Sequence, residues 1–242
     1  MPTFDFKDQT AIVTGVGRVG QIGHAVAEAF ARAGARLIIC DVNAVSVATR
    51  AKEFTAKGYQ VRPAAGDLTK PDVANWLVEE ATNAFGRVDV LVNVAGGFAM
   101  GPVVDAGPEV FDHQVDMNAK TMYIVSRAAL KAMTAQRSGA IVSFASVSAL
   151  NPKAEQAAYS GAKAAVAAMT HALAMEVRDA GVRVNAVAPG TVRTHDNRTT
   201  MGAADGVQWV EIVDVVNAVM FLASDAARGI TGHVLPVSRG EI

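Results

Sequence analysis

Tyr159 and Lys163 lie four positions apart in a segment predicted to be helical, so both side chains point to one face. A phenol beside an ammonium group is an acid/base device, because the positive charge lowers the tyrosine pKa from its usual value of about 10. Ser146 lies thirteen residues before Tyr159, at the end of an apolar run typical of a strand. Its hydroxyl is placed to hydrogen-bond the same substrate oxygen. Tyr–Lys pairs at this spacing are common in helices without catalytic function, so the interpretation depends on the rest of the chain.

A glycine-rich turn follows the first predicted strand, residues 10–14, and leads into a helix predicted over residues 24–31. Four of the nine residues from Gly15 to Gly23 are glycine. Glycines permit a tight turn and close approach of the backbone, and a helix N-terminus offers free N–H groups and the positive end of its dipole. Strand, turn and helix in this order are the context in which such a turn binds a pyrophosphate.

Asp41 ends the second predicted strand, residues 36–41, about twenty residues after the turn. A carboxylate at this place accepts hydrogen bonds from the ribose hydroxyls of an adenosine. Asp also commonly caps a helix that follows a strand. With the glycine-rich turn present, we favour ribose binding.

Strand and helix patterns alternate through the rest of the chain. Further helices are predicted at 44–57, 71–85, 109–133, 156–180 and 213–223, and further strands at 59–65, 88–93, 140–145, 182–187 and 233–237. This alternation predicts an α/β fold with a Rossmann-like, doubly wound parallel sheet of about seven strands and helices on both faces. No linker or shift in composition divides the chain, so residues 1–242 are predicted to form a single domain. The long irregular stretch predicted from Pro189 to about Gln208 is expected to cover a site.

Composition excludes several other classes of function. The formal net charge of −1 shows no basic excess, so neither nucleic acid nor an anionic membrane is an expected partner. The single cysteine, Cys40, excludes an internal disulfide and a cysteine-based zinc site, and the five histidines have no metal-like spacing, so no metal is expected. No apolar run reaches the roughly 18 residues of a membrane span. Without a visible secretory signal, a cytoplasmic protein is expected.

Several motifs occur in the same order as in the short-chain dehydrogenase/reductase family, which the chain resembles over essentially its full length. Thr14-Gly15 with the following glycines resembles the family's cofactor turn, and Asp67 matches the acid that meets the adenine. The segment 93–96 is similar to the family's Asn-Asn-Ala-Gly segment, and 184–190 with Thr194 is similar to the segment at the nicotinamide end.

The resemblance implies a catalytic set of Asn118, Ser146, Tyr159 and Lys163. Tyr159 would be the general acid/base at the substrate oxygen, and Ser146 would orient and polarise that oxygen. Lys163 would lower the pKa of Tyr159 and hydrogen-bond the nicotinamide ribose. Asn118 would hold a water in a proton relay to Lys163. Hydride chemistry belongs to the cofactor, while the protein supplies position and proton handling.

The same resemblance implies a cofactor site along the carboxyl ends of the strands. The residues implied to bind the cofactor are Gly15, Arg18, Gln21, Ile22, Asp41, Asp67, Leu68, Asn93, Ala95, Gly96, Tyr159, Lys163, Pro189, Gly190, Val192 and Thr194. The glycine-rich turn departs from the family pattern because it is longer, and Gln21 replaces a glycine where the helix opens. Val94 replaces the second Asn of the family's segment.

The choice between NAD and NADP depends on two charged residues. Arg18 in the turn favours the 2′-phosphate of NADP, whereas Asp41 repels a 2′-phosphate and Val42 supplies no compensating base. We therefore expect NAD.

The expected function is an NAD-dependent oxidoreductase that interconverts a secondary alcohol or diol and a ketone. The alternatives are an NADP-dependent 3-oxoacyl reductase and a catalytically silent dinucleotide-binding protein, which need not keep all four catalytic residues. The partner is a small-molecule substrate. Its pocket is expected at 97–102, 147–156 and 194–208, whose charged residues Lys153, Glu155, Asp196, Arg198 and Asp205 have mixed sign. The family usually pairs its alanine-rich helices, which implies a dimer or a homotetramer.

Overall fold

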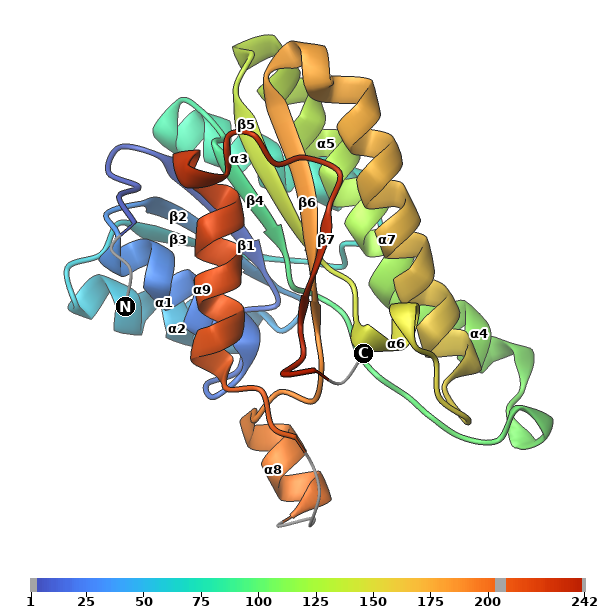
Figure 1. The fold of residues 1–242 in the computed structure, drawn as a ribbon. Helices are drawn as coiled ribbons and strands as arrows, with labels where there is room; N and C mark the ends of the chain where they lie inside the picture. The colour runs from blue at the N-terminus through green and yellow to red at the C-terminus, as the bar shows by residue number, and fades with distance from the viewer. Residues whose placement is uncertain (1–3, 203–207, 241–242) are drawn as a thin grey trace.

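A parallel sheet of seven strands is the centre of the structure, a computed structural model that describes residues 4–202 and 208–240 (Figure 1). The order of strands is β3-β2-β1-β4-β5-β6-β7. The strands are β1 (Thr10–Thr14), β2 (Arg36–Asp41), β3 (Val61–Ala65), β4 (Val90–Asn93), β5 (Gly139–Phe144), β6 (Val182–Pro189) and β7 (Val234–Val237). The predicted Rossmann-like sheet is confirmed. Its order reverses between β1 and β4, and ligands of open α/β sheets bind in the crevice at such a switch point.

Helices cover both faces of this sheet, and α9 and α7 lie on opposite sides in Figure 1. Because side chains alternate along a strand, Ile12 packs into the cluster under α3, α5 and α7, while Val13 packs into the cluster under α1, α2 and α9. The helices are α1 (Ile22–Arg32), α2 (Ala44–Ala56), α3 (Pro71–Phe85), α4 (Pro108–Gln114), α5 (Thr121–Gln136), α6 (Val147–Leu150), α7 (Ala157–Val177), α8 (His195–Met201) and α9 (Ile212–Ala223).

The helix predicted over residues 109–133 is present, since α4, a π-helical turn (Val115–Lys120) and α5 follow one another without a break, but the π turn within it was not predicted. Asn118 lies in this turn, and its side-chain amide donates to the carbonyl oxygens of Gln114 and Gly97, both at 3.0 Å. The bond to Gly97 requires the amide to reach a loop outside the helix. Single π turns of this kind are frequent at functional sites.

Two short helices were not predicted: α6 lies within 147–156, which is expected to line the pocket, and α8 lies within 189–208, which is predicted to be irregular. The Ser146 hydroxyl accepts the Ser148 N–H at 3.1 Å at the start of α6, and the Thr194 hydroxyl accepts the Asn197 N–H at 3.2 Å at the start of α8. Both are side-chain N-caps, which satisfy N–H groups that have no partner within the helix. The prediction for 189–208 is therefore wrong at α8. Residues 203–207, with the predicted pocket residue Asp205, lie outside the described part of the chain.

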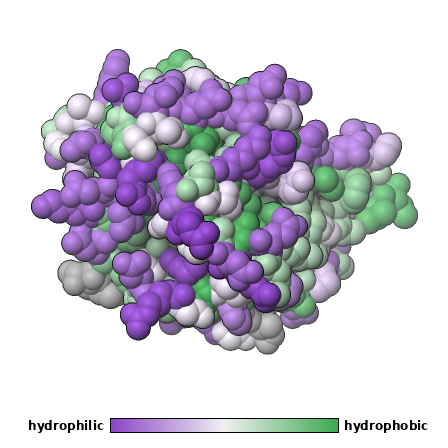
Figure 2. Space-filling model, turned by 90° about the horizontal axis from the view of Figure 1, so that it is seen from above, coloured by the Kyte–Doolittle hydropathy of each residue, from purple (hydrophilic) through white to green (hydrophobic). Residues whose placement is uncertain are grey.

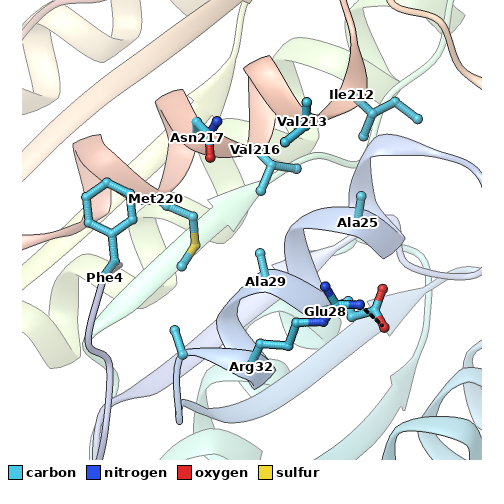
Figure 3. A pocket seen from close by; sticks show the side chains of 11 residues that line it. Phe4, Ala25, Glu28, Ala29, Arg32, Ile212, Val213, Val216, Asn217 and Met220 are labelled. Atoms are coloured by element: carbon cyan, nitrogen blue, oxygen red, sulfur yellow. Dashed lines mark ion pairs between the residues drawn. The ribbon is translucent and has the colours of Figure 1, made fainter. Parts of the chain in front are cut away.

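An apolar cavity of about 440 Å³ lies between α1 and α9 (Figure 3). Small side chains of α1 face larger apolar side chains of α9 across it, among them Ala25 and Ala29 opposite Val216 and Met220. Its charged lining residues, Glu28 and Arg32, form an ion pair at 3.1 Å. None of the predicted catalytic residues lines this cavity, so we assign it no part in the chemistry.

Residues 97–107, here called the apolar arm, extend from the end of β4 to the start of α4. The arm carries four exposed hydrophobic side chains: Phe98, Met100, Val103 and Val104. The right-hand edge of the molecule in Figure 2, where Figure 1 places this segment, is hydrophobic, while most of the rest of that view is hydrophilic. A backbone hydrogen bond of 2.9 Å from Gly101 N–H to Glu155 O ties the arm to the loop before α7.

Candidate active site

The four predicted catalytic residues come together at the carboxyl ends of β4 and β5. Lys163, on the second turn of α7, is 6% exposed, and its Nζ donates to the carbonyl oxygen of Phe144 at 2.7 Å. Tyr159 lies one turn earlier, with the Lys163 Nζ 5.9 Å from its ring centroid. The helical spacing of four positions therefore places phenol and ammonium side by side, as the sequence predicts.

Ser146 and Asn118 complete the set from two other elements. The Ser146 hydroxyl, at the end of β5, is hydrogen-bonded to Tyr159. Asn118 Oδ1 accepts the Gly97 N–H at 3.2 Å. A Cβ placed on Gly96 would lie 2.6 Å from Asn118 Oδ1 and 3.6 Å from Lys163 Nζ, so Gly96 is the residue around which these two side chains meet.

Burial controls the ionisation of the central pair. It raises the pKa of Tyr159, and the hydrogen bond with Ser146 opposes this increase. The net direction is upward because desolvation of the phenolate outweighs the hydrogen bond with Ser146, and the lowering expected from Lys163 stays a prediction. Burial also lowers the pKa of Lys163 to about 8, since the protein interior disfavours the charged ammonium.

A cleft of about 720 Å³ runs along the carboxyl edge of the sheet beside these residues. It crosses the β1/β4 switch point, where open α/β sheets bind their ligands. Nine of the predicted cofactor residues line it: Gly15, Arg18, Gln21, Ile22, Asp41, Asp67, Leu68, Ala95 and Gly96.

The glycine-rich turn folds closely against the strands on either side. A Cβ on Gly23 would lie 2.1 Å from the carbonyl oxygen of Gly15, and one on Gly17 would lie 2.7 Å from the Asp41 carboxylate. The Gly17 N–H donates to Asp41 Oδ2 at 2.7 Å. Gly15, with φ of 73°, has the left-handed backbone that glycine adopts without strain. A turn with glycine at its closest approaches to the strands, beside a fixed carboxylate, fits the pyrophosphate and ribose of a dinucleotide.

Five predicted cofactor residues have other surroundings. Asn93 is buried, and its amide donates to the hydroxyls of Ser126 and Ser143 at 3.0 and 3.2 Å. The others, outside the lining of the cleft, are Pro189, Gly190, Val192 and Thr194. Val192 is buried and bridges Val210, and Thr194 caps α8. A cofactor role for these residues stays a prediction.

Other kinds of catalytic centre have little support in the described residues. Cys40 is buried, and burial raises the pKa of its thiol to about 12, so it is a poor nucleophile. Within 4–202 and 208–240, no three His, Cys, Asp or Glu side chains are grouped as metal ligands. In the same ranges, no helix is both long and apolar enough to span a membrane.

The sequence pattern of the short chain dehydrogenase family matches residues 9–203 of this chain. The chain belongs to this family. It is therefore a dehydrogenase/reductase acting on CH–OH groups, in a family that uses nicotinamide dinucleotides.

Similar proteins have different named activities. A hydroxy(phenyl)methylsuccinyl-CoA dehydrogenase subunit of Thauera aromatica is 33% identical, with 97% of this chain and 96% of that protein covered. A 3-oxoacyl-acyl-carrier-protein reductase of Chlamydia muridarum is 32% identical, with 96% and 97% covered. An NAD(P)-dependent L-rhamnose 1-dehydrogenase of Azotobacter vinelandii is 34% identical, with 96% of each chain covered.

A solved structure of a short-chain type dehydrogenase/reductase from Mycobacterium ulcerans has the same fold. It superposes with a TM-score of 0.92 at 31% identity, covering 98% of this chain and 90% of the other. The architecture is therefore that of the short-chain dehydrogenases.

Phe98 lies in the segment 97–102 that was expected to line the substrate pocket, but its contact with Tyr159 was not predicted. The rings of Phe98 and Tyr159 meet edge to face, with centroids 4.8 Å apart and an interplanar angle of 90°. Phe98 is 55% exposed, so it presents an apolar face to whatever binds beside Tyr159. In the sequence, the signal for this contact was an aromatic residue directly after the segment 93–97.

We predict that Lys163→Met stabilises the fold near neutral pH, because it removes a buried charge. Lys163 has a pKa of about 8 when folded, against 10.5 for the ordinary side chain. Between pH 8 and pH 10.5 the unfolded chain binds more protons than the folded chain. The free energy of unfolding of the wild type therefore increases as pH rises through this range. The advantage of the variant in free energy of unfolding should shrink by up to roughly 3 kcal/mol from pH 7 to pH 10.5.

Urea unfolding of both proteins across this pH range measures the difference. Lys52→Met, which removes an exposed ammonium from α2, is the matched control for loss of a positive charge. An advantage for Lys163→Met that does not vary with pH would contradict the burial argument.

Proposed function

We propose that this short-chain dehydrogenase uses NAD to interconvert a secondary alcohol or diol and a ketone, with Tyr159 as the general acid/base. The observation that carries the proposal is the meeting of Tyr159, Ser146, Lys163 and Asn118 beside Gly96, at the end of a cleft that fits a dinucleotide. A catalytically silent binding protein has no need of this full set. Bound cofactor would accept the hydride as NAD in alcohol oxidation and donate it as NADH in ketone reduction, and the side chains handle the proton.

Proton transfer takes place at the Tyr159 hydroxyl. In ketone reduction, this hydroxyl donates its proton to the developing alkoxide while the Ser146 hydroxyl hydrogen-bonds the same oxygen. In alcohol oxidation, the phenolate takes the proton. The Lys163 ammonium, 5.9 Å from the Tyr159 ring, supplies the positive charge that phenolate requires in a buried site. With a pKa near 8, Lys163 carries this charge at neutral pH.

The apolar arm supports a substrate with an uncharged, apolar substituent. The Phe98 ring packs at a right angle to the Tyr159 ring, and Met100 is exposed two residues further along. Apolar surface of this kind favours apolar groups beside the reacting carbon.

Asp41 supports NAD over NADP. Its carboxylate is oriented by two backbone N–H groups, from Gly17 at 2.7 Å and from Asn43 at 3.0 Å. Both bonds hold the carboxylate at the edge of the cleft, where it can accept the ribose hydroxyls. The Chlamydia relative, a 3-oxoacyl-acyl-carrier-protein reductase, keeps the NADP-dependent reductase as the second candidate, and Arg18 is the residue that favours it. A cytoplasmic location stays a prediction.

Self-association into a dimer or tetramer is also part of the proposal. The outer surfaces of α4, α5 and α7 carry exposed hydrophobic side chains, including Phe111, Tyr123 and Met175. Exposed apolar groups on neighbouring helices favour association with another surface.

Tyr159→Phe is expected to remove proton transfer while the ring keeps its packing against Phe98. Turnover should fall by at least about 10²–10⁴, the usual contribution of general acid/base catalysis. Steady-state kinetics with a panel of alcohols and ketones, followed by absorbance of the reduced cofactor, provides the measurement. NAD binding should be retained. A variant with near-wild-type turnover would contradict the assignment of Tyr159 as the general acid/base.

Asp41→Ser is expected to relax cofactor preference toward NADP. Unit charges about 4 Å apart repel by about 4 kcal/mol at an effective dielectric constant of about 20. After screening, repulsion of the 2′-phosphate by Asp41 should still give a preference for NAD of about tenfold or more, which the variant would lose. The readout is kcat/KM for both cofactors. Asp179→Ser, at an exposed carboxylate after α7, controls for the loss of one negative charge. A wild-type enzyme that already prefers NADP would show that Asp41 does not decide the choice.

Light scattering at micromolar concentration is expected to give two or four times the 25.1 kDa chain mass. Tyr123→Glu, on α5, should shift the protein toward smaller species by placing a charge on the proposed interface. Val45→Glu, at an exposed position on α2, should not. A wild-type protein with monomer mass contradicts the proposal.

A further inference from the structure

The lengthened glycine-rich turn is attached to the start of α8. The His195 N–H donates to the carbonyl oxygen of Gly20 at 3.0 Å, and a Cβ placed on Gly20 would lie 3.1 Å from the His195 Cβ. One residue further along α8, the Asp196 carboxylate forms an ion pair with the guanidinium of Arg18. Three contacts thus join two segments that are about 175 residues apart in sequence, and α8 itself projects below the body of the molecule in Figure 1.

Arg18 is the one charged residue between Gly15 and Gly23, and it lines the cofactor cleft together with Asp41. A guanidinium at this place is suited to a 2′-phosphate, because it binds phosphate through paired N–H groups. In the structure, those N–H groups face Asp196 instead. The cation that favours NADP is therefore neutralised by a carboxylate on a different element.

We propose that Asp196 is a positioning residue for cofactor selection, which holds Arg18 on α8 and away from the adenosine 2′ position beside Asp41. The proposal rests on the proposed NAD-dependent function and deepens it. Discrimination against NADP then has two parts: repulsion by Asp41, and removal of the compensating cation by Asp196.

The ion pair is exposed, with 71% of the Arg18 side chain and 44% of the Asp196 side chain accessible. Exposed pairs typically contribute no more than about 1 kcal/mol, partly because two mobile side chains must be ordered. Here the backbone bond and the close contact between Gly20 and His195 already hold the two segments together. The effect expected on NADP binding is therefore measurable but limited to a few-fold.

Other charged groups also face this region. Asp41, Asp67, Lys70 and Asp116 line the cleft, and Arg198 follows two positions after Asp196 on α8. Lys70 in particular is a second cation that a phosphate could meet. A single substitution at Asp196 therefore does not separate an effect through Arg18 from a general change in charge, and a double-mutant cycle is required.

The experiment measures Kd for NAD and for NADP by isothermal titration calorimetry, at low and at moderate salt, without substrate. The proteins are wild type, Asp196→Asn, Arg18→Gln and the double variant. Asp196→Asn is expected to tighten NADP binding by about threefold to fivefold and to change NAD binding by less than about twofold. The gain should shrink as salt rises. In the Arg18→Gln background, Asp196→Asn should leave the Kd for NADP unchanged.

Asp116→Asn is the matched control, because Asp116 also lines the cleft and also pairs with a cation, Lys120, at 2.9 Å. It should not reproduce the gain in NADP affinity. The proposal is overturned if Asp196→Asn changes both cofactors equally, if the gain persists without Arg18, or if Asp116→Asn matches it. A wild-type protein that prefers NADP would contradict the proposed NAD preference instead, and the cycle would still test whether Asp196 acts through Arg18.

Discussion

The hydroxyl of Thr14 is the contact on which the cofactor cleft depends. It accepts the N–H groups of Val94 and Ala95, both at 3.0 Å, and so ties the end of β1 to the end of β4. These are the two strands between which the sheet order reverses. The Thr14 side chain therefore extends the pairing of β1 with β4 and links the start of the glycine-rich turn to the segment that leads to Gly96. The left-handed Gly15 then lets the chain turn within contact of Ala95.

The position proposed for Lys163 in catalysis comes at a cost in stability. Lys163 is buried, and the carbonyl oxygen of Phe144 accepts from its ammonium. A charge in such a place destabilises the fold, yet the same desolvation strengthens its field at the nearby phenol. The lowered pKa of Lys163 and the raised pKa of Tyr159 have this one cause. Conflicts of this kind between local stability and site chemistry are expected at active sites.

The contacts between the turn and α8 join parts of the site that are usually treated separately. We propose cofactor recognition for the turn after β1, and we expect the segment after β6 to cover the site. Here Gly20 and Arg18 of the turn touch His195 and Asp196 at the start of α8. A shift of α8 would therefore also move the glycine-rich turn, because a backbone hydrogen bond and an ion pair join the two segments.

The sequence by itself determined the succession of strands and helices along the chain, because hydrophobic periods of two and of 3.6 residues are local properties. It also placed Tyr159 and Lys163 on one helix face and identified the strand–turn–helix unit and the family. Only the tertiary structure decided the π turn at Asn118, since the hydrogen bonds with Gly97 come from a loop 21 residues away. The direction of the Tyr159 pKa, the contact of Phe98 with Tyr159 and the pairing of Arg18 with Asp196 were decided in the same way. Burial and long-range contacts set all three, and no local pattern in the chain encodes them.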